Sequence, residues 1–392
     1  MMNSPFSLRD FFDEGHRPAD QQCLGIESER FCLTSDNQVV QYSDVNGIAD
    51  IVERLRVISG WKAKYEGENI MSLHANDGRS ITLEPGGQIE FGTTPQVKVA
   101  DLETEINDYR QMLTQVAEQT GLQFMCTGAH PSAEPEAIER LPKARYDILE
   151  PHLQQADELG IHMMKTTAGV QINFDHVDAD DAMLKLRTVF ALSPVIQAMF
   201  ANSPKHGFKS WRGHVWTRTD NARCGIVESL VAPNSTISDY IEYMLDVPML
   251  FVERDGVFVD MRGKSFRDYY ASGEATEADW SLHLSTPFPE VRFRPQIELR
   301  CADAVSDELS LALAALVKTV FYNSSALQSA SELTADWTFS QRVATLHNAH
   351  KSALDGLAPN GKPLHDYAQR LLDLAQSSAT QSQLQFLQPL LG

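Results

Sequence analysis

The sequence lacks the motifs that mark several common protein classes. Its five cysteines are scattered over 392 residues without a CxxC pair, which argues against a disulfide framework and against a zinc site. There is no GxxxxGK[ST] and no GxGxxG motif, so we expect neither a P-loop nor a Rossmann nucleotide site. The longest apolar run, at 189–201, is interrupted by Ser, Pro and Gln and is too short to span a bilayer.

Basic residues are also scarce, with 33 Lys and Arg against 53 Asp and Glu and a formal charge of −20. A surface of this charge repels phosphate backbones and anionic lipids, so we expect no nucleic-acid partner and no membrane partner. The segment 6–14 carries acids, where signal and transit peptides avoid them. Together with the unpaired cysteines, this predicts a cytoplasmic protein.

The spacing of apolar residues predicts one α+β domain over residues 1–392, with mostly antiparallel strands. Helical spacing occurs at 47–58, 99–120, 182–201, 307–327, 338–354 and 364–374. Strand-like alternation occurs at 24–33, 80–91, 169–175, 250–259 and 291–301. Asp255-Gly256 is typical of a hairpin turn. Strands dominate the middle of the chain, and the region from about 305 onward is predicted to be helical.

Four of the strand-like segments combine one apolar face with one polar face, because alternate side chains point to opposite sides of a strand. The polar faces hold Glu27 and Glu29; Glu84, Gln88 and Glu90; Gln171, Asn173 and Asp175; and Gln296, Glu298 and Arg300. A solvated outer face explains any one of these strands alone. Clustered carboxylates, however, repel one another unless cations neutralise them. Oxygen ligands without clustered Cys or His favour Mg²⁺ or Mn²⁺, and such ions imply a nucleotide phosphate as their other ligand.

A second unusual segment, 202–225, gathers cations in an acidic protein. It contains Lys205, Lys209, Arg212, Arg218 and Arg223, with Asp220 as its single acid. One interpretation is a clamp for phosphates or a substrate carboxylate, which Arg holds with two parallel hydrogen bonds. The other is a surface loop whose cations pair with neighbouring acids. On spacing alone both stay open, and Arg145 taken by itself is typical of a surface residue.

An ordered set of motifs resembles the plant-type glutamate–cysteine ligase family, which also occurs in bacteria. The most informative are Leu24-Gly-Ile-Glu-Ser-Glu-Arg-Phe31, Leu83-Glu-Pro-Gly-Gly-Gln-Ile-Glu90, Arg212-Gly-His-Val-Trp-Thr-Arg-Thr-Asp220 and Ile297-Glu-Leu-Arg-Cys-Ala-Asp303. Others lie at 167–173, 200–204, 245–249, 288–292 and 333–337. One departure is Thr166-Thr-Ala-Gly169, where plant members tend to have Arg-Thr-Cys-Thr.

The resemblance implies a glutamine-synthetase-like fold, in which a curved, mostly antiparallel sheet forms an active-site funnel with helices packed outside. It implies ATP-dependent ligation of the γ-carboxylate of L-glutamate to the amino group of L-cysteine through a γ-glutamyl phosphate, the first step of glutathione synthesis. ATP and two or three Mg²⁺ ions, or Mn²⁺, are the implied cofactors. A monomer or a homodimer is expected.

The family's site residues carry over by motif. The implied metal ligands are Glu27, Glu29, Glu84, Glu90 and Glu298. Substrate binding is implied for Arg145, Arg212, Trp216 and Gln171, nucleotide binding for Gln88 and Arg300, and a catalytic role for Arg212 and Arg300. The general base stays unassigned. Three alternatives remain open: a ligase that uses another amine, a small-molecule kinase of the same superfamily, and a non-catalytic protein with this fold.

Overall fold

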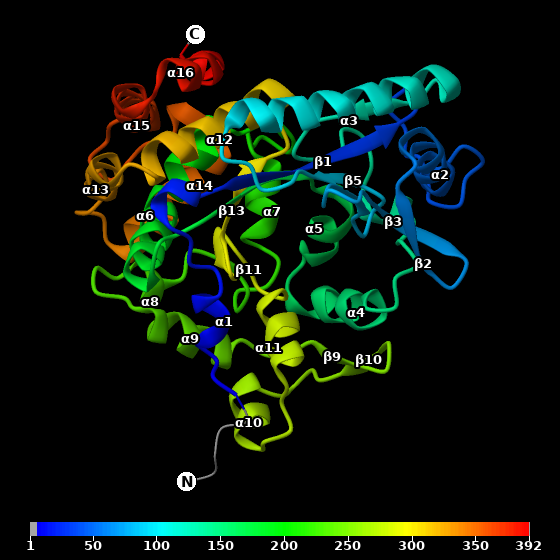
Figure 1. Ribbon diagram of the computed structural model, residues 1–392, viewed down its shortest axis with the longest axis horizontal. Helices are drawn as coiled ribbons and strands as arrows, with labels where there is room; N and C mark the ends of the chain where they lie inside the picture. The colour runs from blue at the N-terminus through cyan, green and yellow to red at the C-terminus, as the bar shows by residue number, and fades with distance from the viewer. Residues whose placement is uncertain (1–5, 392) are drawn as a thin grey trace.

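A curved antiparallel sheet forms the centre of the computed structural model, which describes residues 6–391 (Figure 1). Its strands run in the order β12-β13-β7-β1-β5-β4-β3-β2, and β6 also pairs with β1. In chain order they are β1 (Leu24–Leu33), β2 (Lys62–Glu66), β3 (Asn69–His74), β4 (Ser80–Leu83), β5 (Ile89–Gly92), β6 (Gln123–Met125), β7 (Gly169–Phe174), β12 (Val291–Phe293) and β13 (Ile297–Asp303). All of these pairings are antiparallel.

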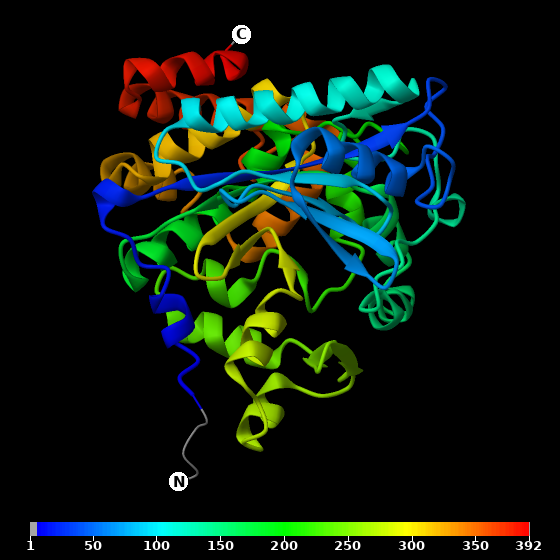
Figure 2. The same cartoon turned by 45° about the vertical axis from the view of Figure 1, so that its right-hand side comes forward.

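Helices cover the outer face of this sheet, as Figure 2 shows. These helices are α2 (Ile48–Ser59), α3 (Val99–Thr120), α6 (Ala179–Met199), α12 (Asp307–Phe321), α13 (Ser324–Glu332), α14 (Phe339–Ser352), α15 (Leu364–Ser378) and α16 (Gln381–Leu387). Helix α12 packs on β1 and β7, α6 on β12 and β13, and α2 on β3. Helix α6 is apolar on nearly all sides because it lies between the sheet and α13–α15.

Short elements lie on the inner side of the sheet. They include α4 (Tyr146–Ala156), α5 (Gly160–Thr166), α7 (Trp211–Trp216), α8 (Glu228–Val231) and α9 (Ile237–Asp246). The hairpin β9 (Phe251–Arg254) and β10 (Val257–Asp260) leads to α10 (Phe266–Ala271) and α11 (Glu277–Leu284). The parallel pair β8 (Cys224–Gly225) and β11 (Phe288–Pro289) joins the segment after α7 to the segment after α11, and α1 (Asp10–Asp13) lies near the N-terminus. The 3₁₀ turns are Ala19–Gln21, Pro135–Ala137, Ala353–Asp355 and Gln388–Leu390.

Local sequence explains where α7 begins and how the chain turns between β4 and β5, both of which border the inner face of the sheet. The Ser210 hydroxyl accepts a hydrogen bond from the Gly213 amide and so caps α7, which carries Arg212. The turn between β4 and β5 needs two glycines. Gly87 has φ of +82°, and a side chain at Gly86 would lie 2.4 Å from the Lys165 carbonyl oxygen. This turn therefore sits directly against α5.

The predicted fold class is confirmed: strands and helices occur in the expected segments, and the Asp255-Gly256 turn joins β9 to β10. The helical region after residue 305 is also confirmed. Spacing did not reveal α4 and α5, which are short. Within residues 6–391 no single helix has the length and apolarity needed to cross a membrane, although α12 and α13, bent by 98°, meet both criteria as a pair.

Candidate active site

Strand register brings the predicted carboxylates onto the inner face of the sheet. Glu29 on β1 lies opposite Glu90 on β5, and Glu27 lies opposite Gln171 on β7. Glu298 on β13 lies opposite Asn173. Directly opposed residues in an antiparallel pair point to the same side, so polar side chains from four strands form one continuous surface.

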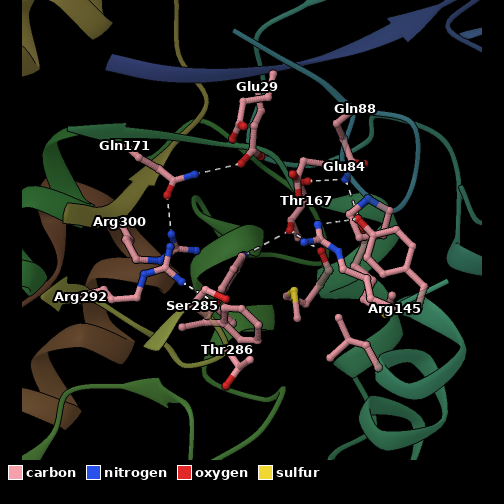
Figure 3. A pocket seen from close by; sticks show the side chains of 18 of the residues that line it. Glu29, Glu84, Gln88, Arg145, Thr167, Gln171, Ser285, Thr286, Arg292 and Arg300 are labelled. Carbon is pink, nitrogen blue, oxygen red and sulfur yellow. Dashed lines mark hydrogen bonds between the residues drawn. The ribbon is translucent and has the colours of Figure 1, made fainter. Parts of the chain in front are cut away.

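This surface is one wall of a cavity of about 280 Å³. The sheet side of the cavity is lined by Glu27, Glu29, Glu84, Gln88, Glu90, Gln171, Arg292 and Arg300. The opposite side is lined by Arg145, Tyr146, Met163, Met164, Trp216, Phe251, Ser285 and Thr286, among others. Figure 3 shows Glu29 between two groups of cations, with Arg292 and Arg300 on one side and Arg145 on the other. The cavity therefore offers cations to an anionic group of a small ligand, beside a row of carboxylates.

A second cavity of about 590 Å³ shares part of its lining with the first. Glu27, Glu90, Arg292 and Arg294 line both cavities. The second cavity extends past Glu298 toward the N-terminal segment, where Arg17 and Cys23 line it. The four shared side chains are thus placed to contact two ligands at once.

Hydrogen bonds hold the carboxylates of β1 and β5 in place. The Gly169 amide donates to Glu29 at 2.7 Å, and the Asn173 side chain donates to Glu27 at 2.7 Å. The Thr82 hydroxyl donates to Glu90 at 2.7 Å. Each carboxylate keeps further lone pairs, since an ionised carboxylate accepts about four hydrogen bonds.

Burial and mutual repulsion disfavour charge on these carboxylates. Burial, and then the nearby Glu84, raise the pKa of Glu29 to about 7 against the opposing effect of Arg212. Burial and then Glu298 raise the pKa of Glu27. The pKa of Glu90 lies well above its usual value, because of burial and the nearby Glu27. The site therefore holds more negative charge than its own cations neutralise.

Glu298 is the exception, because two arginines neutralise it. Arg292 holds its carboxylate with two hydrogen bonds of 2.7 and 2.9 Å, and Arg300 also donates to it. Burial alone would raise the pKa of Glu298, but Arg292 and Arg300 lower it to about 2. Arg300 also donates to Gln171, which links β13 to β7.

Arg212 lines neither of these two cavities. Its side chain is buried, with 4% of its surface exposed, and its guanidinium lies 5.0 Å from the centre of the Trp216 ring. It donates to the Arg300 carbonyl at 3.1 Å. A Cβ at Gly169 would lie 2.7 Å from its Nη2, so any larger residue there would displace the guanidinium. Arg212 thus lies one layer behind the cavity, against residues that do line it.

Arg145 and Gln88 both line the cavity but differ in their contacts. Arg145 precedes α4, and its guanidinium lies 5.2 Å from the centre of the Tyr146 ring. Gln88 is buried and donates to the carbonyls of Thr167 and Met164 at 2.7 and 3.3 Å. It also accepts from the Gly86 amide at 2.9 Å, so both ends of its amide contact backbone.

The structure brings the predicted site residues together around these two cavities, with Arg212 behind them. Sequence reasoning missed Arg292 and Arg294, which lie on and just after β12. The alternation in Val291-Arg292-Phe293 was available as a signal, because it puts Arg292 on the polar face of its strand, and the register of the structure then places it opposite Glu298. Met163, Ser285 and Thr286 come from segments without a polar motif. Within residues 6–391, no group of three or more His, Cys, Asp or Glu side chains is already arranged to hold a metal ion.

This fold is that of the glutamine-synthetase-like ligases. A solved structure of a glutamate–cysteine ligase from Francisella tularensis in complex with AMP has the same fold, with a TM-score of 0.54 and 12% sequence identity. The match covers 94% of this chain and 81% of that one. The chain belongs to glutamate–cysteine ligase family 2, whose model matches residues 23–385.

Two plant relatives support the family assignment. The chloroplastic glutamate–cysteine ligase of Medicago truncatula is 33% identical, and the match covers 94% of this chain and 74% of the relative. The chloroplastic glutamate–cysteine ligase B of Oryza sativa subsp. japonica is also 33% identical, with 96% and 78% covered. The sequence-based prediction of a cytoplasmic location is contradicted by these relatives, whose names place them in the chloroplast. Acids near residue 10 and unpaired cysteines were insufficient grounds for it.

Proposed function

We propose that this protein catalyses ATP-dependent ligation of the γ-carboxylate of L-glutamate to the amino group of L-cysteine. The products are γ-glutamylcysteine, ADP and phosphate. The observation that carries the proposal is a row of recessed glutamates beside Arg292 and Arg300, with Arg145 across the cavity, in a chain that matches glutamate–cysteine ligase family 2 over residues 23–385. Membership of this family does not favour a kinase or a ligase for another amine.

The two cavities suit the two steps of this chemistry. A carboxylate is a poor electrophile, so ATP first converts it to an acyl phosphate, and the amine of cysteine then displaces the phosphate. We place glutamate and cysteine in the cavity of about 280 Å³ and ATP in the neighbouring cavity of about 590 Å³. The phosphoryl group is then transferred from ATP to glutamate at the shared wall, where Arg292 and Arg294 line both cavities.

The carboxylates of the site fit divalent cations. Glu27, Glu29, Glu84 and Glu90 all line the first cavity, and burial with mutual repulsion raises the pKa of three of them. Hard oxygen donors of this kind suit Mg²⁺, which also binds phosphate oxygens. When bound, Mg²⁺ would neutralise charge on the phosphates during transfer. Glu298 belongs to the predicted ligand set, but the arginines that already neutralise it make it the least supported member.

The cations and the aromatic wall have separate proposed roles. Arg145 is placed to bind a substrate carboxylate from the side of α4, since Arg pairs well with carboxylates. Trp216 and Gln171 line the same space and limit its size. Arg300 lies where charge develops on the phosphoryl group. Gln88 lines the substrate cavity and fixes the β4–β5 turn against α5, so in this arrangement it acts through that turn and does not contact the nucleotide.

The test is ADP release by the purified protein with Mg-ATP and L-glutamate, with and without each of a panel of amines. Strong stimulation by L-cysteine, with γ-glutamylcysteine identified by mass spectrometry, is the expected result. Stimulation by a different amine alone would keep the mechanism and refute the acceptor. ADP release that no amine changes, with phosphorylated glutamate as the product, would instead indicate a kinase.

A further inference from the structure

Glu290 is a buried carboxylate that the site as described leaves without a role. It lies between β11 and β12, and only 7% of its surface is exposed. Within residues 6–391 its side chain makes no hydrogen bond, and no Lys, Arg or His nitrogen lies within 4.0 Å of its oxygens. Burying a carboxylate without partners is costly, so its position calls for an explanation.

A small cavity of about 10 Å³ lies next to this carboxylate. Its lining includes Glu290, Arg212, Arg300, Trp216 and Gln197. The Nε atoms of Arg212 and Arg300 are both buried, and neither has a hydrogen-bond partner within the described residues. Two arginines with an unpaired Nε–H and one carboxylate without a side-chain hydrogen bond therefore line the same space.

The size of this cavity suits one water molecule. A cavity needs about 10–15 Å³ of accessible volume to hold a water, and buried waters typically bridge polar groups that lack other partners. A water there could donate to the Glu290 carboxylate and accept from an arginine Nε–H. Opposite charges in such a dry environment attract strongly even across a water.

Glu290 does not lie in the substrate cavity. It is absent from the lining of the cavity of about 280 Å³, whereas Trp216 and Arg300 line both spaces. It therefore contacts neither the proposed phosphates nor the cysteine amine, which excludes it as the general base in this arrangement. Its influence on the reaction must pass through the arginines.

We propose that Glu290 is a positioning residue, which holds the guanidinium groups of Arg212 and Arg300 from beneath the site through one internal water. Arg300 is the member that reaches the ligands, and Arg212 supports it through the Arg300 carbonyl. The proposal rests on the proposed function, because it assumes that Arg300 stabilises the transferring phosphoryl group. Misplacing a charged group by a fraction of an ångström weakens such stabilisation steeply.

The test compares Glu290→Gln and Glu290→Asp with the wild type. Burial raises the pKa of Glu290 to about 7, against the effect of Arg212 and Arg300, so kinetics are measured at pH 8, where the carboxylate is ionised. Gln keeps the size and removes the charge, and we expect kcat to fall at least tenfold with a smaller change in the KM for Mg-ATP. Asp keeps the charge, and we expect it to restore kcat to within about threefold of the wild type.

The control is Glu105→Gln, because Glu105 is equally buried but lies on α3 and accepts hydrogen bonds from Thr94 and Gln96. It should lower the melting temperature and leave kcat unchanged. A Glu290→Gln enzyme with wild-type kcat, or a loss that Asp does not relieve, would overturn the proposal. If the wild type fails to join glutamate to cysteine, the proposed function is refuted. The positioning role of Glu290 is then tested separately by a crystal structure of Glu290→Gln. Unmoved guanidinium groups in that structure would refute the positioning role.

Discussion

Neutralising Glu298 should destabilise the protein by about 3 kcal/mol, although the protein carries a formal charge of −20. The Glu298 carboxylate accepts two hydrogen bonds from Arg292, at 2.7 and 2.9 Å, and another from Arg300. All three side chains are buried. Glu298→Gln keeps the shape of the side chain and leaves the two arginines without their counter-ion.

The magnitude follows from the pKa of this carboxyl group. It is about 2 in the folded protein, against an ordinary value of 4.5. A difference of about 2.5 pKa units at about 1.36 kcal/mol per unit gives ~3 kcal/mol. This lies at the lower end of the range of about 3–5 kcal/mol measured when one partner of a buried ion pair is removed.

The pH dependence has a definite sign. Because folding lowers the pKa of Glu298, its stabilising contribution is fully present above pH 4.5 and is lost as the pH falls through about 2. Urea denaturation of the wild type and Glu298→Gln, in metal-free buffer at pH 7 and at steps from pH 5 to 2.5, measures the difference in their free energies of unfolding. This difference should be about 3 kcal/mol at pH 7 and become smaller in acid. A difference below about 1 kcal/mol at pH 7, or one that acid does not change, would refute the reasoning.

Three further predictions follow from the site. Glu84→Gln should abolish ADP release while changing the free energy of unfolding by less than about 0.5 kcal/mol, because Glu84 is half-buried and lines the cavity; retained turnover would remove Glu84 from the metal site. Gly169→Ala should lower kcat at least tenfold, since its Cβ would displace the Arg212 guanidinium; wild-type kinetics would show that the position of Arg212 is unimportant. Mg²⁺ at 100 times its dissociation constant should stabilise the wild type by about 2.7 kcal/mol, and Glu90→Gln should weaken this effect in a thermal-shift titration; equal shifts in both proteins would exclude Glu90 as a ligand.

The carboxylate surface could be predicted from the sequence because strand geometry is regular. Alternation by two residues fixes which side chains share a face, so it predicts that Glu27 lies beside Glu29, and Gln88 beside Glu90, without knowledge of the strand pairing. The structure adds the register that joins these strands, such as Glu29 opposite Glu90. Register depends on contacts between distant segments, which a single sequence does not specify.

The opposite wall of the cavity could not be predicted in the same way. It comes from short helices and loops, and Met163 and Thr286 have no periodic pattern that would mark them. The motif around Arg212 indicated an important arginine, yet whether it faces the substrate or supports a neighbour depends on how α7 packs against β13. Its burial behind Trp216 is a property of tertiary packing.

The contrast between Glu298 and the other glutamates shows how one surface can serve two purposes. Arg292 and Arg300 neutralise Glu298, and they are thereby fixed at the wall that both cavities share. The same arginines do not pair with Glu27 or Glu90, whose pKa values stay raised by burial and repulsion. Further arginines could neutralise those two carboxylates only by filling the cavity with side chains. A divalent cation neutralises them in the volume of one atom and keeps coordination positions for phosphate oxygens. Uncompensated charge on this part of the sheet is therefore the feature of the fold that supports the proposed metal-assisted phosphoryl transfer.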